Sequence, residues 1–238
     1  MRLASLIVPF LCASTIAHAQ MLPVGSFQMD ETEVTITQFR AFAKATGFQT
    51  KAEKEGGGSI YENGWVKKPG WTWARPFGQP GQDDEPAVHV TYDEAERFCK
   101  WAGKRLPTDV EWMMAAYTET RANPPTPFKT GETYPYPTGS SPQGANCLGE
   151  CGAAPAIDYS SALMRGKGPA RAGTTQRGVN GLFDMGANAW EWVDGFSGRE
   201  RITRGGSWWY GAAQMHRNHL ASKPAETAVA YIGFRCAR

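Results

Sequence analysis

The sequence lacks three features that would each place it at once in a large class of proteins. Neither sign of charge dominates, because 25 lysines and arginines stand against 23 acidic residues; the formal net charge of +2 gives no electrostatic case for nucleic acid or an anionic membrane as a partner. The N-terminal apolar run, residues 3–16, is too short to span a membrane. No internal repeat or low-complexity segment is visible, so the 238 residues suit one domain with one sizeable core.

The N-terminus has the three parts of a secretory signal peptide. Arg2 supplies the positive start, residues 3–16 form the apolar centre, and Ala17-His18-Ala19 matches a cleavage site. We therefore predict a signal peptide over residues 1–19 and a domain over residues 20–238 that is periplasmic or secreted. The alternative is an N-terminal strand buried in the domain. A lipoprotein signal is not favoured, because the residues before Cys12 are large.

Glycine, proline and tryptophan are abundant, with 27, 16 and 9 copies. This composition predicts much irregular backbone held together by aromatic packing. A strand is expected within residues 22–29, and helices are expected to start at Thr35 or Thr37, at Thr91 and at Thr108. The last two have a glutamate three residues on, which completes a capping box. The long connection over residues 50–82 should be pinned to the domain by its tryptophans.

Residues 181–194 combine apolar side chains with side-chain oxygens that cannot be buried without partners. Gly186 and Ala187 leave the backbone nearly bare just before Asn188, so main-chain carbonyls could turn toward the Glu191 carboxylate. Such oxygens are ligands for a hard cation such as calcium. A surface turn whose acidic side chains are merely solvated is an equally good interpretation of these residues.

Six stretches of the chain, in this order, carry a family signature: ETEVT at 31–35, VHVTYDEA at 88–95, WAGKRLPTDVEW at 101–112, GLFDMGANAWEW at 181–192, RGGSW at 204–208 and IGFRC at 232–236. They resemble the motifs of the formylglycine-generating enzyme family, the sulfatase-modifying factor domain. The resemblance extends over nearly the whole predicted mature chain. It implies a single compact, loop-rich α+β domain that elaborates the C-type-lectin fold.

The same resemblance implies two structural calcium sites. In the first, Asn146 and Asp158 would supply side-chain oxygens, with carbonyl oxygens from Cys147 and Ser160. The second would use main-chain carbonyls together with one carboxylate: Gly186, Ala187, Ala189 and Glu191. Both sites would clamp irregular loops that have few backbone hydrogen bonds of their own.

Four cysteines remain after residue 19, and in an oxidising compartment they favour disulfides, for which three pairings exist. The resemblance implies that Cys99 pairs with Cys236. Cys147 and Cys151, which lie close in sequence, then form the second pair. Four free buried thiols would be the alternative; a metal site at Cys147 and Cys151 would need further ligands.

The resemblance breaks down where the family's chemistry lies. In formylglycine-generating enzymes, Arg-Gly-Gly-Ser is followed by two cysteines, five residues apart, that bind copper(I), an ion suited to soft thiolates. Here those positions are Tyr210 and Met215. The sequence therefore argues against conversion of a sulfatase cysteine to formylglycine as this protein's own reaction.

Other side chains with chemical potential lie in the same neighbourhood. We expect Tyr210, His216, Arg217 and His219 to act as catalytic residues, beside a substrate groove lined by Ser207, Trp208 and Trp209. His216 and His219 would share one face of a helix and could hold iron or copper with a third ligand. The alternative is that one histidine packs while the other is exposed. His89, in a short Val-His-Val stretch, is interpreted as a core or rim histidine.

Three functions follow as hypotheses. The first is an exported oxidase or maturation enzyme that acts on a peptide or protein side chain, as the resemblance to exported pyoverdine-maturation proteins implies. The iron-dependent sulfoxide synthases of the wider family use a separate helical domain, which this chain lacks. The second is a non-catalytic module that holds a partner during assembly of another periplasmic protein. The third is a carbohydrate-binding, lectin-like domain. A monomer is expected in each case.

Overall fold

The computed structural model describes residues 20–238, so the predicted signal peptide lies outside the described residues. A central four-stranded sheet has the order β7-β6-β5-β8, in which β5 pairs antiparallel with β6 and parallel with β8. These strands span Trp190–Ser197 (β5), Glu200–Arg204 (β6), Ala221–Lys223 (β7) and Ile232–Gly233 (β8). Two separate hairpins complete the strands: Met21–Val24 (β1) with Phe27–Asp30 (β2), and Ser59–Tyr61 (β3) with Trp65–Lys67 (β4).

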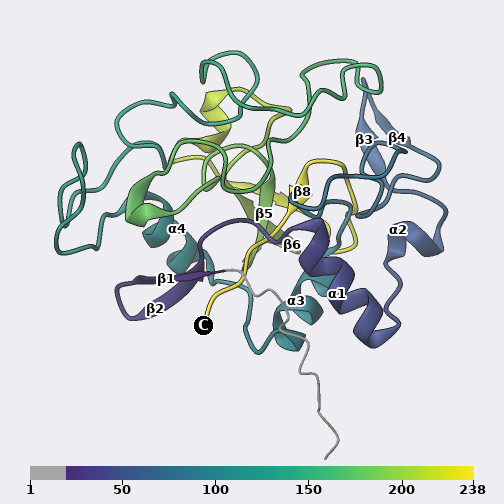
Figure 1. Ribbon diagram of the computed structural model, residues 1–238, viewed down its shortest axis with the longest axis horizontal. Coiled ribbons are helices and arrows are strands. Elements are labelled where there is room, and N and C mark those ends of the chain that lie inside the picture. Colours follow the sequence, from purple (N-terminus) through teal and green to yellow (C-terminus); the bar gives the residue numbers. More distant parts are fainter. Residues whose placement is uncertain (1–19) are drawn as a thin grey trace, which may run out of the picture.

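The helices are short and lie mostly on one side of this sheet, while the long loops between α4 and β5 cover the opposite side (Figure 1). They span Ile36–Thr46 (α1), Lys51–Lys54 (α2), Tyr92–Trp101 (α3) and Asp109–Tyr117 (α4), with 3₁₀ turns at Val179–Gly181 (η1) and Ala212–Met215 (η2). The mixed helix-and-strand, loop-rich single domain expected from the sequence is confirmed. None of the helices in residues 20–238 has the length and apolar character needed to cross a membrane.

Each of the four α-helices begins with a threonine capping box. The side chain of each threonine accepts a hydrogen bond from the backbone N–H three residues on, where the residue is glutamine or glutamate. The side chain of that residue accepts a hydrogen bond from the backbone N–H of the threonine. The capping residues are Thr35, Thr50, Thr91 and Thr108. Thr35 is thus the cap of α1, which ends at Gly47 in the left-handed conformation. The connection over residues 50–82 contains α2 and the β3–β4 hairpin, which the sequence did not predict.

The core is mainly aromatic. Phe39 of α1 stacks on Phe98 of α3 with ring centroids 5.7 Å apart, and Phe234 meets both rings edge-on. The Cys99–Cys236 disulfide fastens α3 to the C-terminal segment beside this cluster, and Cys147–Cys151 closes a short loop. Both predicted pairings are confirmed.

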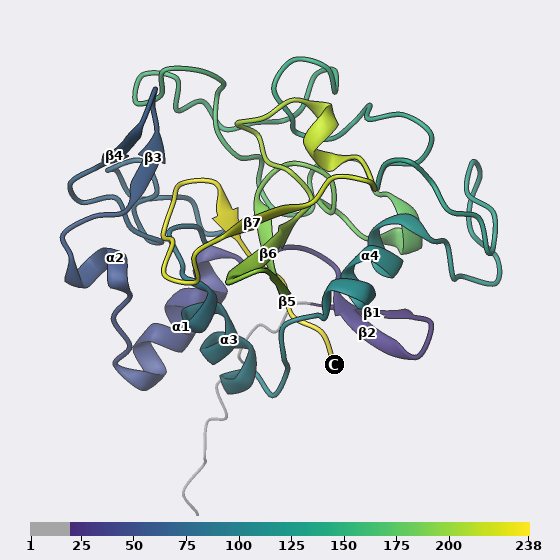
Figure 2. The same cartoon turned by 180° about the vertical axis from the view of Figure 1, so that it is seen from behind.

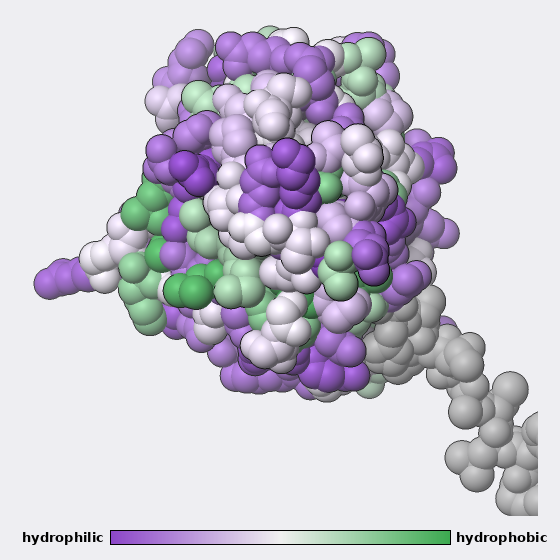
Figure 3. Space-filling model, turned by 90° about the vertical axis from the view of Figure 1, so that its left-hand side faces the viewer, coloured by the Kyte–Doolittle hydropathy of each residue, from purple (hydrophilic) through white to green (hydrophobic). Residues whose placement is uncertain are grey.

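The face that bears the β1–β2 hairpin is largely hydrophilic, with hydrophobic residues in small groups (Figure 3).

His89 is a fully buried core residue, as interpreted from the sequence. Its Nε2 lies 2.9 Å from the carbonyl oxygen of Pro76, which requires the proton on Nε2. The ring packs so closely on Gly58 that a Cβ there would lie 2.1 Å from Nδ1. Burial lowers the pKa of His89 to about 4.

Because this imidazole is buried in its neutral form, we expect the protein to lose stability in mild acid. The folded-state pKa of His89 lies below its unfolded value of about 6.5, so the unfolded chain takes up a proton first as the pH falls. The free energy of unfolding is therefore unaffected by this group above pH 6.5 and falls by about 3 kcal/mol as the pH drops toward 4. His89→Asn suits the positive φ of 58° and removes the titration. Urea unfolding at pH 7 and pH 4.5 should show a smaller fall for the variant, and parallel falls would contradict the assignment.

Candidate functional site

A pocket of about 140 Å³ opens beside Tyr210, the residue that replaces the first family cysteine. Its walls come from β5, β6, β7 and β8 together with the segment 205–220, and they consist of Trp190, Thr203, Tyr210, Gln214, His219, Ala221, Lys223 and Ile232. Of the predicted catalytic residues, the pocket brings together Tyr210 and His219. Trp190, Gln214 and Lys223 were not predicted as site residues.

Tyr210 is held by aromatic neighbours and by a short disulfide loop. Its ring meets Trp190 and Tyr231 edge-on, with centroids 6.0 and 5.6 Å away. The Tyr210 carbonyl accepts a hydrogen bond from Leu148 N–H (2.9 Å), and the Glu150 carboxylate accepts one from Ala212 N–H (3.0 Å). Leu148 and Glu150 belong to the loop closed by Cys147 and Cys151, so this loop fixes the backbone that carries Tyr210.

His219 lies in the pocket as a neutral base. Its ring packs on Trp190 at 5.7 Å between centroids. Partial burial lowers the pKa of His219, and the positive charges of Arg204 and Lys223 lower it further. The imidazole is therefore uncharged at neutral pH and able to accept a proton or a hydrogen bond.

The predicted His216–His219 pair does not form the shared face on which the metal hypothesis depended. The 3₁₀ helix ends at Met215, and residues 216–219 form a turn in which His219 N–H donates to the His216 carbonyl (2.8 Å). His216 instead packs edge-on against Tyr136 and accepts a hydrogen bond from Asn218 N–H. Over residues 20–238, no three histidine, cysteine or acidic side chains converge on one metal position. Iron or copper binding stays a prediction without a ligand set.

The predicted groove of Ser207, Trp208 and Trp209 is wrong, because all three are buried. Trp208 and Trp209 are 2% and 1% exposed, and Ser207 is 1% exposed. Trp208 packs against Phe77, and Trp209 stacks on Tyr231. These tryptophans therefore belong to the core and do not offer a surface for substrate. The predicted catalytic residue Arg217 is exposed and does not line the pocket.

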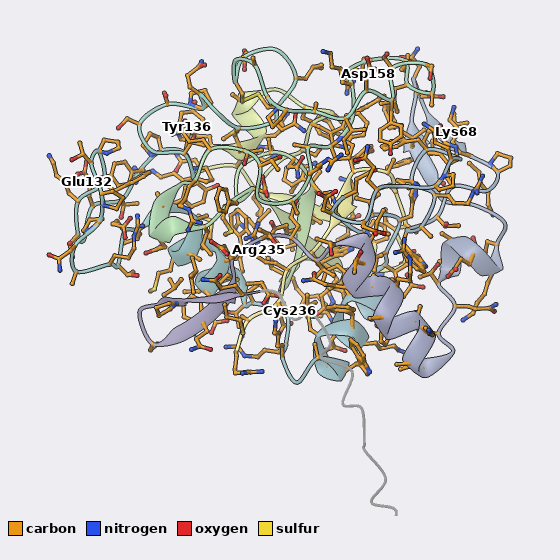
Figure 4. All side chains as sticks on the ribbon, in the orientation of Figure 1. Lys68, Glu132, Tyr136, Asp158, Arg235 and Cys236 are labelled. Atoms are coloured by element: carbon orange, nitrogen blue, oxygen red, sulfur yellow. A yellow bond between two sulfur atoms is a disulfide. The ribbon has the colours of Figure 1, made fainter. Side chains whose placement is uncertain are left out.

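Glu191 has partners other than those predicted for the second calcium site. Both of its carboxylate oxygens accept hydrogen bonds from Arg235, at 2.7 to 2.9 Å, and one also accepts from Trp112 Nε1 at 2.7 Å. Arg235 and Glu191 are both fully buried, and Figure 4 shows Arg235 near the middle of the molecule. Glu191 therefore does not fit the predicted role of a free calcium ligand, whether or not Gly186, Ala187 and Ala189 turn carbonyls toward a cation.

The two side chains predicted for the first calcium site have separate environments. Asn146 is buried and donates its amide hydrogens to the Gly168 carbonyl and to Asn188 Oδ1. Asp158 is exposed in the outer loops (Figure 4), where its Oδ1 accepts hydrogen bonds from the backbone and hydroxyl of Ser160. Calcium binding therefore stays a prediction.

A second, larger cavity lies next to the Tyr210 pocket. This groove has a volume of about 510 Å³ and lies between β7 and the β3–β4 hairpin, which Figure 2 shows facing one another. Lys223 lines both cavities, so they adjoin at this side chain. Trp65, which is 54% exposed, forms part of the wall on the hairpin side. The groove is not predictable from the sequence, because its walls combine residues 51–67 with residues 200–229.

The fold and site define a loop-rich α+β protein whose pocket lies where a known family carries its cysteines. The sulfatase-modifying factor enzyme 1-like domain matches residues 13–238, and the chain belongs to this family. A formylglycine-generating enzyme of Thermomonospora curvata is 30% identical over 264 residues, covering 90% of this chain and 82% of the relative. The inactive C-alpha-formylglycine-generating enzyme 2 of Mus musculus is 29% identical, covering 92% and 77%.

Among solved structures, PvdO from Pseudomonas aeruginosa has the same fold. It superposes with a TM-score of 0.61 at 20% identity and covers 89% of this chain and 80% of PvdO. At this identity the likeness concerns the fold alone. The expected fold, a single domain of the formylglycine-generating-enzyme type, is confirmed.

Proposed function

We propose that this protein is an exported maturation factor that binds an extended segment of another protein or peptide, without generating formylglycine. The observation that carries the proposal is the open pocket beside Tyr210, at the first cysteine position of a family whose enzymes act on a protein cysteine. Met215 stands at the second position and is fully buried. The site thus keeps a recess for a side chain while both reactive thiols are replaced.

The remaining cysteines support the same conclusion about chemistry. All four cysteines in residues 20–238 form disulfides, so no thiolate remains in that range to bind copper(I). The disulfides also suit the oxidising compartment that an exported protein would enter. The relative in Mus musculus that is described as inactive supports loss of the reaction within this family.

The groove beside the pocket supports binding of an extended polypeptide. Strand β7 is an edge strand, since within the described sheet it pairs only with β6. The carbonyl oxygen of Ser222 accepts a hydrogen bond from Lys223 Nζ. An extended segment can add to such an edge through its main chain and place alternate side chains into cavities. Because Lys223 borders both cavities, a segment along β7 would pass the mouth of the Tyr210 pocket.

One observation favours a second candidate, an enzyme that acts on the bound side chain. The neutral imidazole of His219 and the phenol of Tyr210 line the same pocket, and such a pair can accept and donate a proton. Retention of a redox metal by anaerobically purified protein, lost in His219→Ala, would favour this candidate over binding alone.

Selection from a random peptide display library tests the binding function. We expect peptides to be enriched on the purified protein and to lose about tenfold or more in affinity when Gln214→Trp fills the pocket. The matched control is Ala213→Trp, one residue earlier in η2, where the side chain is exposed and outside the pocket. Failure of enrichment, or equal binding to both variants, would contradict the proposal. Conversion of a sulfatase cysteine peptide by the pure protein would contradict it as well.

A further inference from the structure

The Tyr210 pocket contains a positive charge that has no acidic partner. Among the residues that line it there is no aspartate or glutamate, and Lys223 is the one charged side chain. Lys223 is partly buried, and its ammonium group donates a hydrogen bond to the Ser222 carbonyl at 2.9 Å. Within residues 20–238 it forms no salt bridge, unlike Arg204 nearby, which is paired with Asp109. A partly buried, uncompensated ammonium group favours an anionic ligand.

The lysines of the neighbouring groove differ from Lys223 in this respect. Lys51 and Lys67 both lie within salt-bridge distance of Glu55, at 2.8 and 3.6 Å. Their charges are therefore at least partly balanced within the protein. Glu200 and Glu226 also line the groove, but among the described residues neither is within salt-bridge distance of Lys223, which lies where the groove meets the Tyr210 pocket.

Two arginines that do not line the pocket, Arg204 and Arg165, lie near it. Lys223 and Arg204 are both close enough to lower the pKa of His219, after the larger effect of burial. The guanidinium of Arg165 lies 4.5 Å from the ring centre of Trp209 and 5.7 Å from that of Tyr210. Arg165 is exposed and forms no salt bridge within the described residues. A second cation thus lies against the Tyr210 ring.

We propose that the Tyr210 pocket receives an acidic side chain, the carboxylate of an aspartate or glutamate in the bound polypeptide. Lys223, the charged side chain that lines the pocket, is its counter-charge. The Gln214 amide and the Thr203 hydroxyl, which also line the pocket, can donate hydrogen bonds to the carboxylate oxygens. This inference rests on the proposed function, because it names the chemistry of the polypeptide that the same site would bind.

The test uses N-acetyl-glutamate N-methylamide as a minimal probe and the imidazole NMR signals of His219 as the readout. We expect a saturable shift with this probe and about tenfold weaker binding of the glutamine analogue, the effect of one charge-assisted hydrogen bond. Lys223→Met should abolish the preference and Lys223→Arg should retain it. The matched control is Lys67→Met, which alters a lysine of the neighbouring groove and should leave the preference intact. Equal affinity for both probes, or an unchanged preference in Lys223→Met, would overturn the assignment.

The peptides enriched by the library selection separate this inference from the function on which it rests. If Gln214→Trp abolishes their binding but replacing their acidic residues by amides does not, the polypeptide function stands and the inference is wrong. If no peptide is enriched while the glutamate probe binds through Lys223, the inference about charge stands and the polypeptide function is wrong.

Discussion

Replacing Arg235 by methionine is expected to destabilise the protein by about 3–5 kcal/mol, enough to unfold many domains of this size. Arg235 is fully buried and donates to Glu191 and to the carbonyl oxygens of Asp30, Glu31 and Phe183. Its removal leaves Glu191 as a buried charge without a cation and leaves three carbonyl oxygens without this donor. Urea unfolding followed by tryptophan fluorescence measures the loss.

The chain offers a matched control for this prediction at its surface. Arg105 forms a similar two-point pair with Glu111, with both distances 2.6 Å, but the Arg105 side chain is 45% exposed. Arg105→Met should cost about 1 kcal/mol or less, because water screens and replaces the interaction. Similar losses for Arg105→Met and Arg235→Met would mean that burial does not determine the effect. If Arg235→Met does not fold, the double variant Arg235→Met with Glu191→Leu, which removes both charges, should recover folded protein.

Removing the Cys99–Cys236 disulfide is the second change with a large expected effect. The two cysteines are 137 residues apart in sequence, and in the chain-entropy model opening a loop of that length costs about 5 kcal/mol. Both residues are fully buried, so alanine at both positions also loses sulfur packing between α3 and the C-terminal segment. Calorimetry of the Cys99→Ala, Cys236→Ala double variant should show a large fall in melting temperature.

The second disulfide provides the comparison. Cys147 and Cys151 are only 4 residues apart, so the same model gives about 2 kcal/mol for Cys147→Ala with Cys151→Ala. Loop length therefore predicts a larger loss of stability for the Cys99, Cys236 double variant than for the Cys147, Cys151 double variant. A larger loss for the short loop would show that local packing, not chain entropy, dominates at these sites.

The sequence predicted the parts of the fold that are encoded locally. The capping boxes at Thr91 and Thr108 correctly located the starts of α3 and α4, because a threonine and a glutamate three residues apart satisfy the first backbone N–H groups of a helix. Thr50 and Glu53 carry the same signal at the start of α2, but they lie in a stretch whose composition indicates a connection. The pairing of Cys99 with Cys236 came from the family resemblance, since four cysteines alone allow three pairings.

The site was less predictable because its walls are assembled over long distances in sequence. Trp208 and Trp209 were expected at the surface next to Tyr210, but Phe77 and Tyr231, from remote segments, bury them. Nothing near Lys223 in sequence marks it as a pocket residue. Its place on β7, opposite Arg201 of β6, brings it to the pocket. Tyr210 and His219 were found because the motif before them located the region.

The contact between Met215 and the short disulfide loop limits how the family's copper-binding cysteine pair could be introduced here. Cys151 Sγ lies 3.8 Å from Met215 Sδ. A thiol introduced by Met215→Cys would lie close to an existing sulfur–sulfur bond, where a thiolate can attack and exchange partners. Cysteines at positions 210 and 215 alone would therefore favour scrambled disulfide pairings, so a variant designed to bind copper should also lack Cys147 and Cys151.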